Sequence, residues 1–296
     1  MVVSLNLPQI AIIADKDMEL FWDMLDQRLE LCKDALMIRH NMLLGTSSDV
    51  SPIHWQHGAI ARLGKGEKID KYLKDGYSTL SLGYVGVCEM VYAMLGVSHT
   101  TPEGEKFALE VMNHMEDKCM EWKKETGLGF GLYGTPAENL IYRFCRLDKA
   151  RFGEIKNVTD RLYYTNSYHV HVCEEIDAFS KLKFESQFHD ISLGGCISYI
   201  EVPDMSKNIE AVEDIINFIY HNIQYAEINT KPDICYKCGY TGEIQLNKGD
   251  LTWHCPSCGN SDENEMQVMR RTCGYIGTNF WNKGRTAEIG DRVLHL

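Results

Sequence analysis

The chain has 296 residues, of which 44% are hydrophobic and 24% charged, a composition typical of a soluble globular protein with a sizeable core. The formal net charge of -12 leaves no positive field to attract nucleic acid or an anionic membrane, so we expect no direct binding to either, and any phosphate-bearing ligand must be held by local contacts. No apolar run reaches the roughly 18 residues of a membrane span, and no basic segment precedes the first one, so a cytoplasmic protein is expected.

The first apolar segment, Val2 to Ala14, is rich in Val, Ile and Leu and predicts a buried strand, which Pro8 could end early. The chain enters this segment without a leading turn or cap, which suggests that it begins inside a larger architecture. Farther along, apolar residues at helical spacing predict three amphipathic helices, over 17–44, 101–126 and 209–223. Shorter β-like runs cover 168–172 and 196–202.

This alternation of helices and strands favours an α/β fold. After Asn229 the composition changes, because paired cysteines and glycines replace the long periodic segments. The sequence therefore predicts one domain over residues 1–229 and a second over 230–296.

Four of the eleven cysteines form two CxxC pairs, Cys235 with Cys238 and Cys255 with Cys258, separated by sixteen residues. Four thiolates at this spacing can surround Zn²⁺ as a tetrahedron, and a glycine after each second cysteine permits the tight turn this requires. A full ligand set leaves no open position for chemistry, so the zinc would be structural. The alternatives are two redox or disulfide pairs, His254 as a substitute ligand, or a nucleic-acid-binding ribbon, which the acidic charge disfavours.

Downstream stands the sequence RRTCGYIG, residues 270–277, followed by Asn282, Lys283, Gly284 and Arg285. By composition alone this is a turn. Placed after a four-cysteine site, however, it resembles the glycyl-radical loop of the anaerobic (class III) ribonucleoside-triphosphate reductases. The resemblance extends along the chain through VVSLNLPQIA (2–11), GYSTLSLGYVG (76–86), GLYGTPAENLIYRF (131–144), YYTNSYHV (163–170) and GGCISYIEVP (194–203).

The resemblance implies that Gly274 carries the radical. A radical at a glycine α-carbon is planar and delocalised over the flanking peptide groups, and the absence of a Cβ allows this plane. In the family a separate activase, which uses S-adenosylmethionine and an iron–sulfur cluster, generates the radical. The implied fold is the C-terminal half of a ten-stranded α/β barrel, followed by a small zinc-binding radical domain.

The family also uses a thiyl cysteine on a finger loop, which would precede Met1 here, with an allosteric domain farther upstream. Cys88 and Cys196 lie in family-like segments but are interpreted as packing residues, and Cys273 receives no catalytic role. The resemblance places Asn6 near the substrate ribose and Glu138 where a carboxylate could accept a proton. The alternatives are a strand-end asparagine and a glutamate that favours a helix N-terminus.

The sequence thus predicts the C-terminal part of an enzyme that reduces ribonucleoside triphosphates, inactive without its N-terminal portion. Expected partners are the activase, the N-terminal half or a second subunit, and formate or a thioredoxin-like reductant, with the complete enzyme a homodimer. The alternatives are an inactive fragment and a radical-bearing spare subunit that docks onto an oxygen-damaged reductase.

Overall fold

The computed structural model describes residues 1–272, 274–278 and 281–295. Its main helices are α1 (Leu7–Ala14), α2 (Met18–Leu43), α3 (Pro52–Trp55), α4 (Val87–Leu95), α5 (Pro102–Thr126), α6 (Leu140–Phe152), α7 (Ala178–His189), α8 (Ile209–Asn222) and α9 (Lys283–Asp291). Its strands are β1 (Val2–Asn6), β2 (Thr79–Val85), β3 (Gly129–Gly134), β4 (Ser198–Glu201), β5 (Ala226–Asn229), β6 (Ile234–Cys235), β7 (Gln245–Asn247), β8 (Thr252–His254), β9 (Met266–Gln267), β10 (Met269–Arg271) and β11 (Ile276–Thr278).

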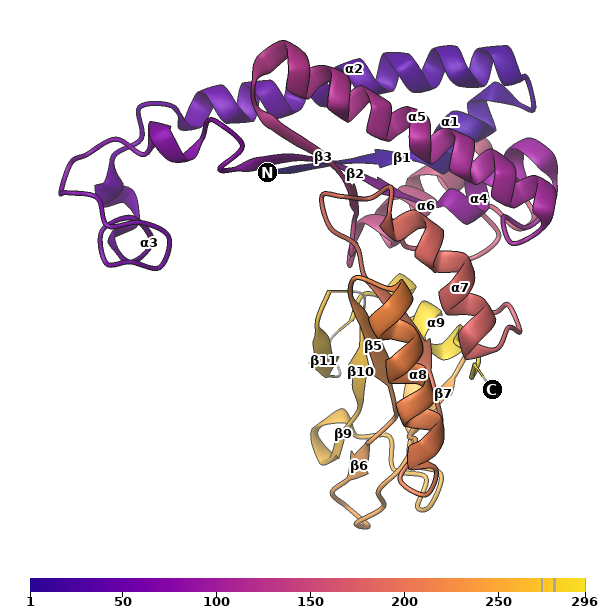
Figure 1. Ribbon diagram of the computed structural model, residues 1–296. Helices are drawn as coiled ribbons and strands as arrows, with labels where there is room; N and C mark the ends of the chain where they lie inside the picture. The colour runs from indigo at the N-terminus through magenta and orange to yellow at the C-terminus, as the bar shows by residue number, and fades with distance from the viewer. Residues whose placement is uncertain (273, 279–280, 296) are drawn as a thin grey trace.

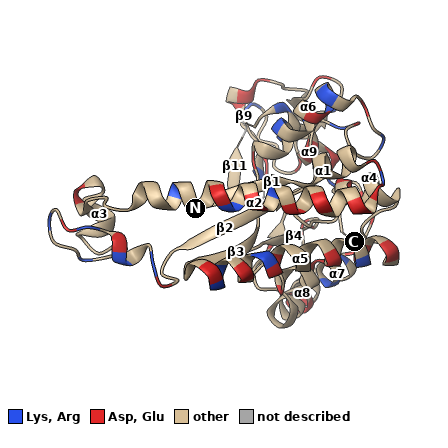
Figure 2. Ribbon diagram, turned by 90° about the horizontal axis from the view of Figure 1, so that it is seen from above, with Lys and Arg blue, Asp and Glu red and all other residues tan. Residues whose placement is uncertain are grey.

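A parallel sheet in the order β1-β2-β3 carries the main core (Figure 1). The long helices α2 and α5 lie side by side across one face of it and bury an apolar stripe each, with Leu25, Leu29 and Trp122 fully buried. Their opposite surfaces carry alternating acidic and basic residues (Figure 2). The predicted amphipathic helices over 17–44, 101–126 and 209–223 are confirmed as α2, α5 and α8.

The predicted strand over Val2 to Ala14 is wrong in its second half, because β1 ends at Asn6 and helix α1 follows. Asn6 caps this helix by accepting a hydrogen bond from the Gln9 amide, and Pro8 lies in its first turn, where a missing N–H costs nothing. The helix is apolar nearly all round because it packs against α4. A continuous apolar run therefore predicted burial correctly but not the type of element.

A second parallel sheet pairs β4 with β5, which confirms a strand within 196–202. Backbone hydrogen bonds join it to the first sheet: Gly194 donates to Leu132 (2.7 Å) and Gly134 donates to Gly195 (2.9 Å). The predicted strand over 168–172 is wrong, because the Val170 amide donates to the Glu185 carboxylate, 3.1 Å away, instead of to a neighbouring strand. The fold is α/β with small parallel sheets, and closure into a ten-stranded barrel stays a prediction.

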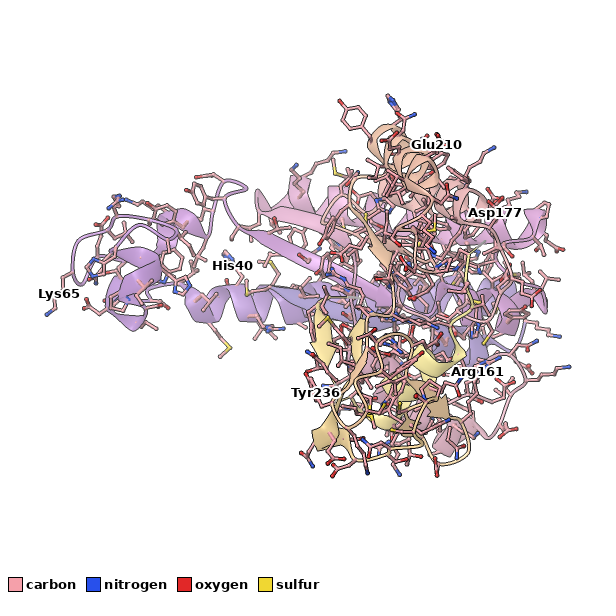
Figure 3. The ribbon with its side chains drawn as sticks, turned by 90° about the horizontal axis from the view of Figure 1, so that it is seen from below. His40, Lys65, Arg161, Asp177, Glu210 and Tyr236 are labelled. Carbon is pink, nitrogen blue, oxygen red and sulfur yellow. The ribbon has the colours of Figure 1, made fainter. Side chains whose placement is uncertain are left out.

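Residues 44–78 form an arm that extends away from the two sheets (Figure 1). His40 on α2 lies near its base and Lys65 at its far end (Figure 3). A small apolar cluster that includes Leu63, Ile69 and Leu73 holds the arm together.

The C-terminal part consists of short antiparallel pairs, β6 with β9, β7 with β8, and β10 with β11, followed by α9. Its last residues return to the α/β part, where the amides of Val293 and His295 donate to the carbonyls of Val172 and Glu201. The two predicted domains are thus in direct contact, and their boundary at residue 230 stays a prediction. Among the described residues, no helix is long and apolar enough to cross a membrane.

Candidate functional site

The four cysteines predicted to bind zinc come together in the C-terminal part. Their sulfurs all lie within 4.8 Å of one another, with Cys235 and Cys258 3.8 Å apart and Cys238 and Cys255 3.7 Å apart. A tetrahedral zinc with Zn–S bonds of about 2.3 Å separates its sulfurs by about 3.8 Å. The cluster therefore has the donor set and spacing to bind a metal ion such as zinc.

Two matching knuckles produce this geometry. In each, the glycine after the second cysteine donates its N–H to the carbonyl of the first: Gly239 to Cys235 and Gly259 to Cys255, both at 2.9 Å. Both glycines have positive φ, 75° and 69°, a conformation in which a side chain would be strained. The sequence pattern of CxxCG thus specifies the turn directly.

The cysteine cluster is tied to the hairpin of β10 and β11, which we call the Gly274 hairpin. Strand β6, which contains Cys235, pairs with β9, and β9 leads into β10. Next to it, buried Asp233 forms an ion pair with buried Arg270 of β10 and accepts the Met269 amide at 2.9 Å. A metal at the cysteines would therefore fix the base of the hairpin.

Gly274 lies at the tip of this hairpin, which Thr272 and Tyr275 close through an N–H to carbonyl bond of 2.8 Å. The Gly274 N–H donates to Oε1 of Glu138, 3.1 Å away, and the Thr272 hydroxyl lies 2.6 Å from the same oxygen. Two residues that the sequence predicts to be catalytic, each in its own role and 136 positions apart in the chain, are therefore in direct contact. Cys273 lies outside the described residues.

Glu138 stands just before α6, in the segment that follows β3. Its side chain is 24% exposed, and its second oxygen lies 3.4 Å from Nε of Arg285, which is 1% exposed. The amide group of Asn282, the N-cap of α9, donates to the carbonyl of Glu138 at 3.3 Å. One carboxylate oxygen therefore contacts Arg285 of α9. The other faces the hairpin tip rather than the N-terminal amides of α6.

A pocket of about 280 Å³ adjoins Gly274, and its lining residues are Tyr133, Gly134, Pro136, Gly195, Cys196, Ile197, Tyr225 and Arg271. Cys196 is half-buried, and burial raises the pKa of its thiol to about 11, so it is protonated at neutral pH. Cys88, by contrast, is fully buried in the core. The pocket brings a thiol, two tyrosines and the predicted radical position to one place.

Asn6 lies at the end of β1 and already has two partners. Its side-chain oxygen Oδ1 caps α1, and its side-chain nitrogen Nδ2 donates to Asp148 at 2.7 Å. Asp148 is buried and also accepts from Gln9 and from the Tyr164 hydroxyl. Contact with a ribose would use the second amide hydrogen of Asn6, and its substrate role stays a prediction.

Sequence reasoning missed Thr272 and Arg285, two side chains that contact the Glu138 carboxylate. Both were visible in the quoted segments, but neither has a spacing that implies a partner near residue 138. Only one local signal existed: an asparagine three residues before Arg285 is a helix N-cap pattern, and Asn282 indeed accepts the Arg285 amide.

Comparisons with known proteins identify the family of the chain. The family described as "Anaerobic ribonucleoside-triphosphate reductase" matches residues 1–295. The chain is 40% identical over its whole length to the anaerobic ribonucleoside-triphosphate reductase of Escherichia coli, of which it covers 42%. It is 38% identical over 99% of its length to the enzyme of that name from bacteriophage T4, of which it covers 48%.

Among solved structures, an anaerobic ribonucleotide reductase superposes with a TM-score of 0.69 over 99% of this chain and 44% of the other, at 21% identity. The Thermotoga maritima enzyme with glycerol in its active site gives a TM-score of 0.66 over 94% of this chain and 41% of the other, also at 21% identity. These likenesses concern the fold, and the chain spans less than half the length of each relative. By its sequence, the chain belongs to the anaerobic ribonucleoside-triphosphate reductase family.

Proposed function

We propose that this chain is the radical-bearing C-terminal part of an anaerobic ribonucleoside-triphosphate reductase, with the radical on Gly274 and a structural zinc at the four cysteines. The observation that carries the proposal is the space around Gly274. Among the described residues, a Cβ built there would meet nothing closer than 3.5 Å. The surrounding space therefore does not by itself require a glycine, which supports a chemical reason for the residue.

Loss of a hydrogen atom from the Gly274 α-carbon would give a planar radical spread over the two adjoining peptide groups. The hydrogen bond from the Gly274 N–H to Glu138 would hold one of these groups in place. The hydrogen atom would be removed by a separate activase, so S-adenosylmethionine and the iron–sulfur cluster belong to that partner. An exposed position at a hairpin tip suits access by another protein.

The substrate would be a ribonucleoside triphosphate, bound in a barrel completed by residues outside this chain. A cysteine of that other portion would give its thiol hydrogen atom to the Gly274 radical, and the resulting thiyl would remove the 3′ hydrogen atom of the ribose. Glu138 would accept a proton as water leaves the substrate. Asn6 would contact a ribose hydroxyl. Formate or a thioredoxin-like protein would supply the electrons, and such an enzyme would act in the cytoplasm.

The missing portion would come from the rest of a longer polypeptide or from a second subunit. Support comes from the chain's coverage of only 42% to 48% of its relatives. The first sheet also has β1 at its edge, and an unpaired strand edge invites association. The complete enzyme is expected to be a homodimer, and this chain alone should be inactive.

The radical is tested by anaerobic activation with the activase, S-adenosylmethionine and a reductant, followed by electron paramagnetic resonance. Wild-type protein should give a glycine-type doublet, which collapses when glycine is deuterated at the α-carbon. Gly274→Ala should give none while remaining folded. A doublet that persists in this variant would move the radical to another glycine.

The partner is tested by anaerobic affinity purification from native cells with mass spectrometry. A co-purifying chain that bears the upstream cysteine would support a two-subunit reductase. Recovery with a full-length reductase whose own chain is cut at its radical glycine would instead favour the spare subunit. Recovery alone would make the chain an inactive fragment.

A further inference from the structure

A buried arginine, Arg285, contacts the Glu138 carboxylate, which in turn binds the Gly274 hairpin. Arg285 is 1% exposed, and its guanidinium donates to the Glu288 carboxylate at 2.8 Å and to the carbonyl of Ala137. Its Nε points to Glu138 at 3.4 Å, an ion-pair distance without hydrogen-bond geometry. Arg285 therefore binds the backbone of the residue before Glu138 and also forms an ion pair with the Glu138 carboxylate.

Arg285 is part of a network of buried ion pairs that extends to residues near the C-terminus. Glu288 binds Arg285 and Arg292 together, and Arg292 also donates to Glu201 at 2.8 Å and to the carbonyl of Arg271 at 2.7 Å. Although burial acts to raise it, the charges of the two arginines lower the pKa of Glu288 to about 2. Arg285 thus stays in a fixed place, because its counterion is ionised at all physiological pH values.

The other carboxylate oxygen of Glu138 faces the hairpin. Its Oε1 is the acceptor for the Gly274 N–H at 3.1 Å and lies 2.6 Å from the Thr272 hydroxyl. That hydroxyl also lies 2.8 Å from the Tyr275 carbonyl, so it can donate to only one of these acceptors at a time. A carboxylate anchored on one oxygen and accepting on the other fixes the orientation of the glycine peptide group.

We propose that Arg285 is a positioning residue for the Gly274 peptide, acting through Glu138, with the Thr272 hydroxyl as the second contact. The inference rests on the proposed function for its consequence but not for its geometry. With the N–H held, the α-carbon keeps one orientation beside the pocket lined by Tyr133 and Cys196. A radical there would keep one orientation too, instead of sampling several in an exposed turn.

The test is hydrogen exchange at the Gly274 amide in unactivated protein, measured by mass spectrometry with residue-level fragmentation. Arg285→Gln, Glu138→Ala and Thr272→Val should each speed exchange, by about tenfold for Glu138→Ala, as expected for loss of a charged acceptor. Lys283→Gln removes a positive charge from an exposed position on the same helix and should leave the rate unchanged.

A double variant separates positioning from general loosening. If Arg285 acts through Glu138, adding Arg285→Gln to Glu138→Ala should change the Gly274 rate no further, whereas independent effects would multiply. Multiplying effects, or an unchanged rate in Arg285→Gln, would overturn the inference. Unchanged metal content and unchanged exchange in β2 identify variants that remain folded. If Arg285→Gln proves misfolded, Thr272→Val and Thr272→Ser decide, because only the serine should restore slow exchange.

Radical measurements on the same variants complete the test. After activation, Arg285→Gln should broaden the glycine-type doublet, and Lys283→Gln should not. Absence of any doublet in wild-type protein that still shows the coupled exchange would refute the proposed function and leave the positioning intact. A normal doublet in wild-type protein, together with an unchanged Gly274 exchange rate in Arg285→Gln, would refute the positioning and leave the proposed function intact.

Discussion

The parallel sheet and the Gly274 hairpin lie in one molecule but are held by different forces. Strands β2 and β3 present Leu80, Leu82 and Leu132 to a core in which these side chains are at most 1% exposed. The hairpin instead buries Arg270 and Thr272, and its contacts are ion pairs and hydrogen bonds to distant residues. Apolar burial tolerates small shifts, whereas charged contacts fix atoms in place.

This difference suits a framework role for the sheet and a positioning role for the hairpin. A sheet stabilised by area can serve as a framework, since its free energy is spread over many contacts. A hairpin stabilised by a few buried charges, the cysteine cluster and α9 depends on each of them, because a buried charge without its partner is costly. Each of the following experiments should affect one region and spare the other.

Loss of the metal should have the largest effect. Structural zinc contributes about 10–16 kcal/mol of binding free energy in small zinc peptides, so removal by a chelator or by Cys235→Ser should disorder the cysteine knuckles and release the Gly274 hairpin. Metal analysis should give about one zinc per chain in wild-type protein. Hydrogen exchange should rise in β6 and β10 but not in β2.

Cys32→Ser serves as the control, because it removes a thiol from α2, away from the cluster, and should leave the metal in place. Rapid exchange in β2 after zinc removal would show that the sheet depends on the metal, which would contradict the contrast between the sheet and the hairpin. Full occupancy in Cys235→Ser would indicate that His254 or another group completes the ligand set.

Trp122→Ala should have the complementary effect on the sheet. The Trp122 ring is fully buried between α5 and β3, where it packs against Phe130 with a centroid distance of 5.5 Å. Truncating a buried tryptophan costs about 3–5 kcal/mol. Urea unfolding should show this loss, while zinc content and Gly274 exchange stay at wild-type values. A comparable loss of zinc would mean that the two regions unfold as one unit.

Sequence reasoning succeeded where the cause was local. Helix α5 was delimited correctly because Thr101 accepts the Gly104 amide, Pro102 begins the helix, and Gly127 ends it at φ 69°. The cysteine cluster was predictable for the same reason, since two CxxCG segments specify two identical turns. Residues 7–14 failed because a helix buried on most sides has no polar periodicity to distinguish it from a strand.

The candidate site was only half predictable. The resemblance gave Gly274 and Glu138, but nothing in the sequence implied that they share a hydrogen bond. Arg285 binds Ala137 across 148 positions, and such pairing follows from how α9 packs on α6. Long-range charged contacts leave no periodic pattern, so the residues that orient the glycine were found only in the structure.

Two buried carboxylates should give the regions opposite responses to pH. Glu89 lies on α4. Burial raises its pKa from 4.5 to about 7, although hydrogen bonds from Thr165 act to lower it. The folded state then holds a proton that the unfolded chain releases, so this contribution to stability is present below about 4.5 and is lost as pH rises to about 7.

Glu288 behaves in the opposite way. Its folded pKa of about 2 is below the ordinary 4.5, so its contribution is present above 4.5 and is lost as pH falls toward 2. Hydrogen exchange read separately near β2 and near α9 should show these two slopes. Glu89→Gln should abolish the first and Glu288→Gln the second. A slope that survives its own substitution would assign the titration to another group.

The smallest effects should come from two glycines of the C-terminal part, and their contrast tests whether Gly274 is chemical rather than structural. A Cβ at Gly284 would lie 2.6 Å from the Tyr142 Cβ and 2.7 Å from the Leu162 carbonyl, so Gly284→Ala should cost about 1–3 kcal/mol in urea unfolding. Gly274→Ala has ordinary contacts and should change stability by no more than about 0.5 kcal/mol. After activation the order should reverse, with a doublet in Gly284→Ala and none in Gly274→Ala. If Gly274→Ala were instead the less stable variant, the glycine would have a structural explanation, and its assignment as the radical site would lose its main support.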